Sequence, residues 1–335
     1  MVTARPRVRI IATGGSISGV GPHRLDYLLY SESGRRLTIE QMVARVPEVH
    51  EIAEVRGEDL ASVGSTSIGP QEWLQIAQRI NQSFDEEPEL SGVVVTHGTA
   101  TLEETAYFLH LTVKSAKPVV VTGAMRPPTA VSTDADLNLF DAIRIAACPD
   151  AGGRGVLTVL NNEIHSARDV RKSNTLRLDT FQSHHLGLLG YADSDGQVRF
   201  YRSVTRQHTI GTPFNVASLP RLPRVDLVYT YGGADGLLVD AVRQHGSAGL
   251  VVAGFGSGTF PPVFLEAAMR AATDGIPVVL ASRSSSGRTI MTPKKEEAGF
   301  IVADDLHPQK ARILLMLALT ISHERQAIQE MFYRF

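Results

Sequence analysis

Short apolar runs rich in β-branched residues alternate with amphipathic stretches through the first half of the chain. The pattern predicts strands over residues 8–15, 91–98, 117–125 and 154–162, and helices over residues 69–84, 102–113 and 134–147. This alternation is typical of a parallel sheet with helices on both faces. The strands are apolar almost throughout, which indicates that both faces of the sheet are buried.

The pattern lapses over residues 201–223, which are rich in Thr, Ser, Arg and Pro and have no clear period. It then resumes, with strands expected over residues 225–233, 248–258 and 276–284 and helices over 261–275 and 307–320. A chain of 335 residues exceeds the usual size of one core. We therefore expect two α/β domains. The larger, residues 1–200, has a doubly wound, mainly parallel sheet, and the smaller, residues 224–335, has a parallel sheet. Residues 201–223 are expected to be the interdomain linker.

The composition is that of an ordinary globular enzyme, with 43% hydrophobic and 20% charged residues. A net charge of -2 provides no broad basic surface, so we expect no nucleic-acid partner and no acidic membrane partner. Cys148 is the single cysteine, which excludes an intrachain disulfide and any CxxC site. There is neither a membrane-spanning apolar run nor the apolar core of a secretory signal, and we expect a cytoplasmic protein.

Four predicted strand ends in the first half are rich in glycine and hydroxyl residues. They are "ATGGSIS" at 12–18, "VGSTSIG" at 63–69, "THGTAT" at 96–101 and "TGAMRP" at 122–127. Ligands of open parallel sheets bind beyond the carboxyl ends of the strands, where helix N-termini converge. The four turns together predict a pocket lined by small residues, backbone N–H groups and hydroxyls.

Nucleotide and metal sites are poorly supported. The glycine-rich segments 13–19 and 254–260 lack a complete G-x-G-x-x-G pattern with a following acidic residue, and there is no phosphate-binding P-loop. His184 and His185 are adjacent, which is not the spacing of ligands on one helix face, and no carboxylate pattern surrounds them. From these patterns we expect neither a bound nucleotide nor a metal ion.

Nucleophilic catalysis fits the strand ends better, because a hydroxyl nucleophile needs a base and oxyanion donors. Ser16 follows Gly14 and Gly15, where N–H groups are free, and Thr99 occupies a matching strand end. Lys172 is a candidate base if burial lowers its pKa. From spacing alone, the alternative remains that Ser16 and Thr99 are simple helix caps and Lys172 a surface ion-pair partner.

Two of these segments resemble family signatures. "ATGGSIS" is similar to ATGGTIA, and "THGTATLEETAYF" is similar to HGTDTMEETAYF. "KPVVVTGAMRP", "RDVRKSNT" and "HPQKARILL" extend the likeness in order. The chain therefore resembles the bacterial-type L-asparaginase and glutaminase-asparaginase family over essentially its whole length.

The resemblance implies a fold of two α/β domains and a homotetramer built from intimate dimers. Each active site would lie between the N-terminal domain of one subunit and the C-terminal domain of its neighbour. The implied reaction is hydrolysis of the side-chain carboxamide of a small molecule through an acyl-enzyme, without a cofactor. Ammonia is released as L-asparagine, and possibly glutamine, is converted to the acid.

The resemblance also assigns roles to residues. Ser16 corresponds to the nucleophile, Tyr30 (or its neighbour Tyr27) to the flap tyrosine that activates it, and Thr99 with Lys172 to the second hydroxyl and its base. Ser65 would bind the substrate's α-carboxylate, and the carbonyl of Ala124 would contact its amide. The full substrate-binding set that the resemblance implies is Gly15, Ser65, Thr66, Gly98, Ala100, Ala124 and Ser257.

Four positions depart from the family, and each of the family's residues helps to bind the substrate's α-ammonium group. Ala100 replaces an aspartate, Thr66 a glutamine and Ser257 an asparagine. The family's glutamate falls near Thr292 to Lys295, with Glu296 and Glu297 displaced by a few residues. The departures leave two alternatives beside asparagine hydrolysis: a hydrolase for an ω-amide or acyl compound without a free α-amine, and a non-catalytic paralogue that binds a small molecule.

Overall fold

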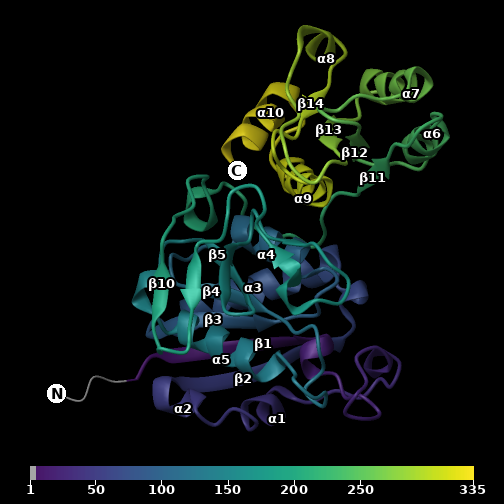
Figure 1. The fold of residues 1–335 in the computed structure, drawn as a ribbon. Helices are drawn as coiled ribbons and strands as arrows, with labels where there is room; N and C mark the ends of the chain where they lie inside the picture. The colour runs from purple at the N-terminus through teal and green to yellow at the C-terminus, as the bar shows by residue number, and fades with distance from the viewer. Residues whose placement is uncertain (1–4) are drawn as a thin grey trace. The chain divides into compact units, whose positions relative to one another are not determined.

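The computed structural model describes residues 5–335, and the chain folds into two compact units, Met1–Ala217 and Ser218–Phe335 (Figure 1). The first four residues belong to the N-terminal stretch in which no secretory signal is expected, and they lie outside the described residues. Within residues 5–335, no helix is both long enough and apolar enough to cross a membrane.

The first unit contains an eight-stranded sheet in the order β10-β9-β6-β5-β4-β3-β1-β2. The strands from β2 to β5 along this order are parallel, whereas β6, β9 and β10 are antiparallel to their neighbours. The sheet is therefore mixed but mainly parallel, as predicted. Its strands are β1 (Arg7–Gly14), β2 (Glu54–Val63), β3 (Leu90–Thr96), β4 (Val119–Thr122), β5 (Val156–Leu160), β6 (Glu163–Ser166), β9 (Gly190–Ala192) and β10 (Val198–Phe200).

Helices cover both faces of this sheet. On one face, α1 (Ile39–Val43), α2 (Val49–Ile52) and α5 (Ala135–Ala146) share a core with alternate residues of β1, β3, β4 and β5. On the other face lie α3 (Pro70–Glu86) and α4 (Leu102–Thr112), where Trp73 stacks on Phe108. The predicted helices over 69–84, 102–113 and 134–147 correspond to α3, α4 and α5. Burial on both faces explains why the central strands are apolar throughout.

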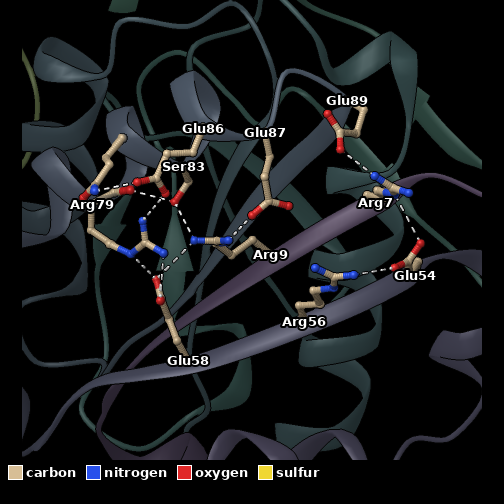
Figure 2. A network of polar contacts seen from close by, with 11 residues as sticks. Arg7, Arg9, Glu54, Arg56, Glu58, Arg79, Ser83, Glu86, Glu87 and Glu89 are labelled. Carbon is tan, nitrogen blue, oxygen red and sulfur yellow. Dashed lines mark hydrogen bonds and ion pairs between the residues drawn. The ribbon is translucent and has the colours of Figure 1, made fainter.

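The edge strand β2 is not recognisable from its sequence, because "EVRGEDLASV" carries charged residues and stays largely accessible. A charged network fastens it to β1 and α3 (Figure 2). Arg79 of α3 donates hydrogen bonds to both carboxylate oxygens of Glu58, at 2.7 and 3.0 Å. Arg9 of β1 reaches Ser83 at 3.3 Å and pairs with Glu87. Bidentate guanidinium–carboxylate pairs hold geometry well, so ion pairs replace apolar burial at this edge.

Residues 201–217, most of the segment expected to link the domains, belong to the first unit. Lys114 Nζ donates to the carbonyls of Thr209 and Thr212 at 3.2 and 2.8 Å, and Phe214 and Val216 are buried. Hydrogen bonds from the Lys114 side chain to backbone carbonyls, together with the buried side chains, hold this stretch in place. Such contacts leave no periodic pattern in the sequence.

The second unit has a parallel four-stranded sheet in the order β11-β12-β13-β14, as predicted for the smaller domain. The strands are β11 (Val225–Tyr229), β12 (Gly249–Gly254), β13 (Val278–Ser282) and β14 (Ile301–Val302), and the helices are α6 (Leu237–Gln244), α7 (Pro262–Thr273), α8 (Pro293–Glu297), α9 (Pro308–Ala318) and α10 (Arg325–Arg334). The sequence pattern does not predict α10, because this helix buries little beyond Ile328 and Phe332 and is mostly polar.

Candidate active site

The carboxyl ends of β1, β2 and β3 meet in the first unit around a cavity of about 220 Å³. This volume suits a small metabolite rather than a nucleotide. The cavity brings together most of the residues proposed from the sequence: Gly15, Ser16, Tyr30, Ser65, Thr66, Gly98, Thr99, Ala100 and Lys172. Gly19, Ser31, Arg36 and Gly64 complete its wall.

Glycines allow the strand ends to approach so closely. A Cβ atom on Gly15 would lie 2.2 Å from the Cα atom of Gly98, and one on Gly98 would lie 2.7 Å from Cβ of Ser65. Gly15 also has φ of +87°, a conformation that side chains disfavour. Gly15 and Gly98 therefore bring the Ser16, Ser65 and Thr99 turns together.

Ser16 begins the short 3-10 helix Ser16–Ser18 immediately after β1, and it is buried. Its hydroxyl donates a short hydrogen bond to the carbonyl oxygen of Ala124, beyond the end of β4. Ala124 is buried and is reached through this bond, although it does not itself line the cavity.

Tyr30 and Tyr27 are clearly distinguished by their positions. Tyr30 lines the cavity and is hydrogen-bonded with Ser16, whereas Tyr27 is 39% exposed and lies under the guanidinium of Arg126. Burial raises the pKa of the Tyr30 phenol, the hydrogen bond with Ser16 lowers it, and the Asp26 and Asp134 carboxylates raise it.

A buried carboxylate fixes the turn that carries Tyr30. The two oxygens of Asp26 accept the backbone N–H groups of Leu29 and Tyr30, both at 2.9 Å. The segment that contains these residues, 19–36, is also held in place by a hydrogen bond from the Gly21 N–H to Thr129 Oγ1, with a length of 2.9 Å. The sequence does not single out Asp26, because an aspartate in a loop is common as a local cap.

Thr99 and Lys172 form a second contacting pair in the cavity. Lys172 Nζ lies 2.8 Å from Oγ1 of Thr99. Lys172 belongs to β7 (Arg171–Lys172), which pairs with β8 (Phe181–Gln182), and its backbone N–H donates to the Glu103 carboxylate. Burial lowers the pKa of the Lys172 ammonium, and the nearby Glu103 charge raises it. A lysine with a lowered pKa beside a hydroxyl can accept its proton.

The part of the cavity wall around Ser65, Thr66 and Ala100 presents hydroxyls and backbone groups rather than acids. The N–H group of Ala100 donates to Ser65 Oγ at 3.3 Å, and Thr101 Oγ1 donates to the Ser65 carbonyl at 2.7 Å. Thr66 lies beside them. None of the cavity-lining residues within the described part of the chain is Asp or Glu. The space beside Ala100 therefore has no carboxylate from this unit.

A buried histidine network supports the Thr99 turn and is not recognisable in the sequence. Trp73 Nε1 donates to Thr105 Oγ1 at 2.9 Å, so the Thr105 hydrogen points to His97 Nε2, also 2.9 Å away. The Nδ1–H group of His97 then donates to the Gly98 carbonyl at 2.8 Å. Burial lowers the pKa of His97 to about 4, and the neutral ring fixes the turn.

In the second unit, Ser257 and α8 lie together. Lys295 Nζ donates to the carbonyls of Ser257 and Ile290 at 2.7 and 2.8 Å, and Ser257 Oγ accepts the Ile290 N–H at 3.0 Å. Glu296 and Glu297 occupy the end of α8. Lysine, not glutamate, is thus the charged side chain in contact with Ser257.

Two further features lie outside this cavity. A larger hollow of about 720 Å³ lies at the amino-terminal ends of β1, β3 and β4, near Arg7, Lys117 and Cys148. Within residues 5–335, no group of three or more His, Cys, Asp and Glu residues could hold a metal ion. His184 and His185 are exposed.

Comparison with known families gives matches to both units. Residues 7–206 match the family described as "Asparaginase, N-terminal", and residues 224–332 match "Glutaminase/Asparaginase C-terminal domain". Together these matches span most of the chain.

Individual proteins are similar over nearly the full length. L-asparaginase 2 of Bacillus subtilis is 42% identical, covering 98% of this chain and 87% of the relative. L-asparaginase 2 of Escherichia coli is 40% identical, covering 99% and 94%. Glutaminase-asparaginase of Pseudomonas fluorescens is 37% identical, covering 99% and 91%. The crystal structure of a probable cytoplasmic L-asparaginase from Campylobacter jejuni has a TM-score of 0.93 and 39% identity, covering 99% of this chain and all of that chain.

Proposed function

This chain belongs to the asparaginase family of amidohydrolases, and from that premise we propose that it hydrolyses the side-chain carboxamide of L-asparagine to L-aspartate and ammonia, with glutamine as a second substrate. The observation that carries the proposal is the cavity of about 220 Å³ in which Ser16 and Thr99 stand beside Tyr30 and Lys172. Two hydroxyls, each with its own proton-transfer partner, suit a two-step acyl transfer.

In the proposed mechanism, Ser16 Oγ attacks the carboxamide carbon while its proton passes to the phenol oxygen of Tyr30, which gives its own proton on towards the leaving amide nitrogen. The tetrahedral intermediate collapses as the C–N bond breaks and the amide nitrogen, having taken up a proton, leaves as ammonia. The acyl group remains bonded to Ser16 Oγ as an ester. A water molecule, deprotonated through Thr99 and Lys172, then attacks the ester and releases the acid. The 2.8 Å contact between Lys172 Nζ and Thr99 Oγ1 supports the role of this pair as the base.

The binding roles follow the same assignment. Gly15 and Gly98 give the substrate room and backbone contacts, Ser65 and Thr66 receive its α-carboxylate, and the Ala124 carbonyl receives its amide. Ser257 would reach the site from a neighbouring subunit in a homotetramer made of intimate dimers. Native mass spectrometry tests that assembly, which should have about four times the 36.3 kDa mass of one chain. We further propose a cytoplasmic location, which cell fractionation tests.

The test of the activity is ammonia release together with covalent trapping. We expect ammonia from L-asparagine and a mass adduct on Ser16 after treatment with a diazo-type amide analogue. Ser16→Ala should abolish turnover and keep the melting temperature. An adduct on Thr99 would move the nucleophile there. A chain that gives neither ammonia nor adduct would be a non-catalytic paralogue that binds a small molecule.

One observation favours a second candidate substrate. The described residues of the cavity wall include no carboxylate, so a substrate's α-ammonium has no ionic partner there. Breaking a buried ion pair costs about 3–5 kcal/mol. An ω-amide or acyl compound with no free α-amine, such as succinamate or N-acyl-asparagine, avoids this cost. Ammonia release from asparagine, glutamine, succinamate and N-acyl-asparagine decides between the candidates, and preference for asparagine by orders of magnitude excludes the second.

A further inference from the structure

Arg36 lines the cavity, and the sequence pattern assigns it no role. Its backbone forms an isolated antiparallel bridge with Gly19. The adjacent Leu37 N–H donates to the Ser18 carbonyl at 2.7 Å, and the Val20 N–H donates to the Arg35 carbonyl at 3.0 Å. These bonds hold the backbone of Arg36 beside the Ser16–Ser18 turn. The position of its Cα atom, from which the side chain extends, is therefore fixed.

The guanidinium of Arg36 borders an open space next to Gly64. A Cβ atom built on Gly64 would lie 3.9 Å from Arg36 Nη2 and 3.9 Å from Thr66 Oγ1, and apart from Gly64 and its two chain neighbours no other heavy atom of the described residues lies within 4 Å. Among the described residues, Nη1 of Arg36 makes one hydrogen bond, a long one of 3.4 Å to the Ser62 carbonyl. The space beside Gly64 is therefore bordered by a cation and a hydroxyl.

The charge of Arg36 is not neutralised within residues 5–335, where it has no carboxylate within ion-pair distance. Ser65 Oγ accepts the Ala100 N–H, which leaves the Ser65 hydroxyl hydrogen available to an acceptor. A guanidinium has donors in a planar fork that matches a carboxylate. Arg36, Ser65 and Thr66 thus offer a cation and two hydroxyls to an anion.

We infer that Arg36 is a specificity-determining residue that binds the substrate's carboxylate together with Ser65 and Thr66. The inference rests on the proposed function and deepens it, because it names the group by which the enzyme selects its amides. The carboxylate, rather than the α-ammonium, contributes most of the binding. The substrate class is therefore the ω-amides that carry a carboxylate two or three carbons from the reacting carboxamide, with or without an amino group.

Three amides separate the two charged groups. L-asparagine has both, succinamate lacks the ammonium, and β-alaninamide lacks the carboxylate. In Arg36→Gln we expect KM for asparagine and for succinamate to rise about 10- to 100-fold, with kcat changed less than about threefold. The kcat/KM value for β-alaninamide should stay at the wild-type level. Arg35→Gln, at an exposed neighbouring arginine outside the cavity, is the matched control and should behave as wild type.

A binding measurement makes the inference independent of turnover. Calorimetric titration with succinate should give a dissociation constant about 10- to 100-fold higher for Arg36→Gln than for wild type or Arg35→Gln. Gly64→Ala is a second variant. Gly64 has φ of -70° and ψ of 147°, which alanine adopts readily, and the added methyl would occupy the space beside Arg36. It should weaken succinate binding while the melting temperature is retained.

The outcomes distinguish the inference from the proposed function. If asparagine is hydrolysed but Arg36→Gln binds succinate as tightly as Arg35→Gln, the inference is wrong and the activity stands. An equal loss of kcat/KM for β-alaninamide would also overturn it, because a carboxylate-specific contact cannot produce that loss. If no amide releases ammonia while succinate binding still depends on Arg36, the inference stands and the activity fails.

Discussion

Nζ of Lys172 lies 2.8 Å from Oγ1 of Thr99, although the two residues are 73 positions apart in the chain. The contact joins the short strand β7 to the turn after β3. It turns a threonine that could have been a simple helix cap into a hydroxyl with an adjacent amine. The backbone bond from Lys172 to Glu103 fixes the same lysine from the other side.

This arrangement predicts the pH dependence of Glu103→Gln. The base must be neutral, so kcat/KM should rise with pH as Lys172 loses its proton. Burial lowers the pKa of Lys172, and the Glu103 charge opposes this effect. Removing that charge lowers the pKa further, so the rising limb of the profile of kcat/KM against pH should move to lower pH.

The control is Glu51→Gln, which removes one exposed carboxylate from α2 and should leave the profile in place. Lys172→Met should lose about 10²- to 10⁴-fold in kcat, as is typical for removal of a general base. A limb that moves to higher pH in Glu103→Gln would contradict the assignment of Lys172 as the base.

Tyr30 and Tyr27 provide a matched pair of substitutions. Tyr30→Phe removes the phenol that is hydrogen-bonded with Ser16, and we expect kcat to fall about 10²-fold or more with little change in the melting temperature. Tyr27→Phe removes a hydroxyl from an exposed ring under Arg126 and should keep kcat within about twofold. Steady-state ammonia release measures both. An equal fall in kcat in the two variants would mean that the segment 19–36, and not the Tyr30 phenol, is required.

The strand ends can be predicted well from the sequence, because each is formed by residues that follow one another in the chain. Apolar β-branched runs indicate the strands, and "ATGGSIS" and "THGTAT" place Ser16 and Thr99 at adjacent carboxyl ends once the sheet is parallel. The edge strand β2 and helix α10 give no such signal, because one is stabilised by ion pairs and the other buries few residues.

The parts of the site that the sequence does not reveal depend on contacts between distant segments. Glu103 lies on α4 and acquires its role only when β7 lies beside it. Arg36 is one of two consecutive arginines, and only the backbone bridge to Gly19 determines which of them lines the cavity. Tyr30 differs from Tyr27 through its hydrogen bond with Ser16, a residue of another segment. Residue spacing alone carries no information about such contacts.

His97 predicts a component of the acid sensitivity of the fold. Its pKa is lowered by burial from 6.5 to about 4, so between these values the unfolded chain binds a proton that the folded chain does not. The free energy of unfolding should therefore fall as the pH drops through this window, by up to about 1.4 kcal/mol per pH unit from this residue. Above pH 6.5 the histidine contributes no slope.

Urea unfolding of wild type and His97→Gln at pH values of about 7.5, 6.5, 5.5 and 4.5 measures this contribution. The variant should be less stable at the highest pH, because it disturbs the bonds to Thr105 and Gly98, and should lose less stability on acidification. His184→Gln, at an exposed histidine of the same unit, should keep the wild-type slope. If the free energy of unfolding falls equally with pH in wild type and in His97→Gln, His97 does not titrate in this way.

Ala100→Asp tests whether the missing carboxylate decides substrate preference. Ala100 is exposed at the cavity, so a larger side chain fits without displacing the core. An aspartate there would pair with a substrate's α-ammonium and repel a substrate that carries only a carboxylate. We expect the ratio of kcat/KM for asparagine to that for succinamate to rise about 10- to 100-fold, the range of one charged hydrogen bond. Ala217→Asp adds the same charge at an exposed position away from the cavity and should leave the ratio unchanged. An unchanged ratio in Ala100→Asp would mean that the ammonium is already bound by a group outside this cavity wall.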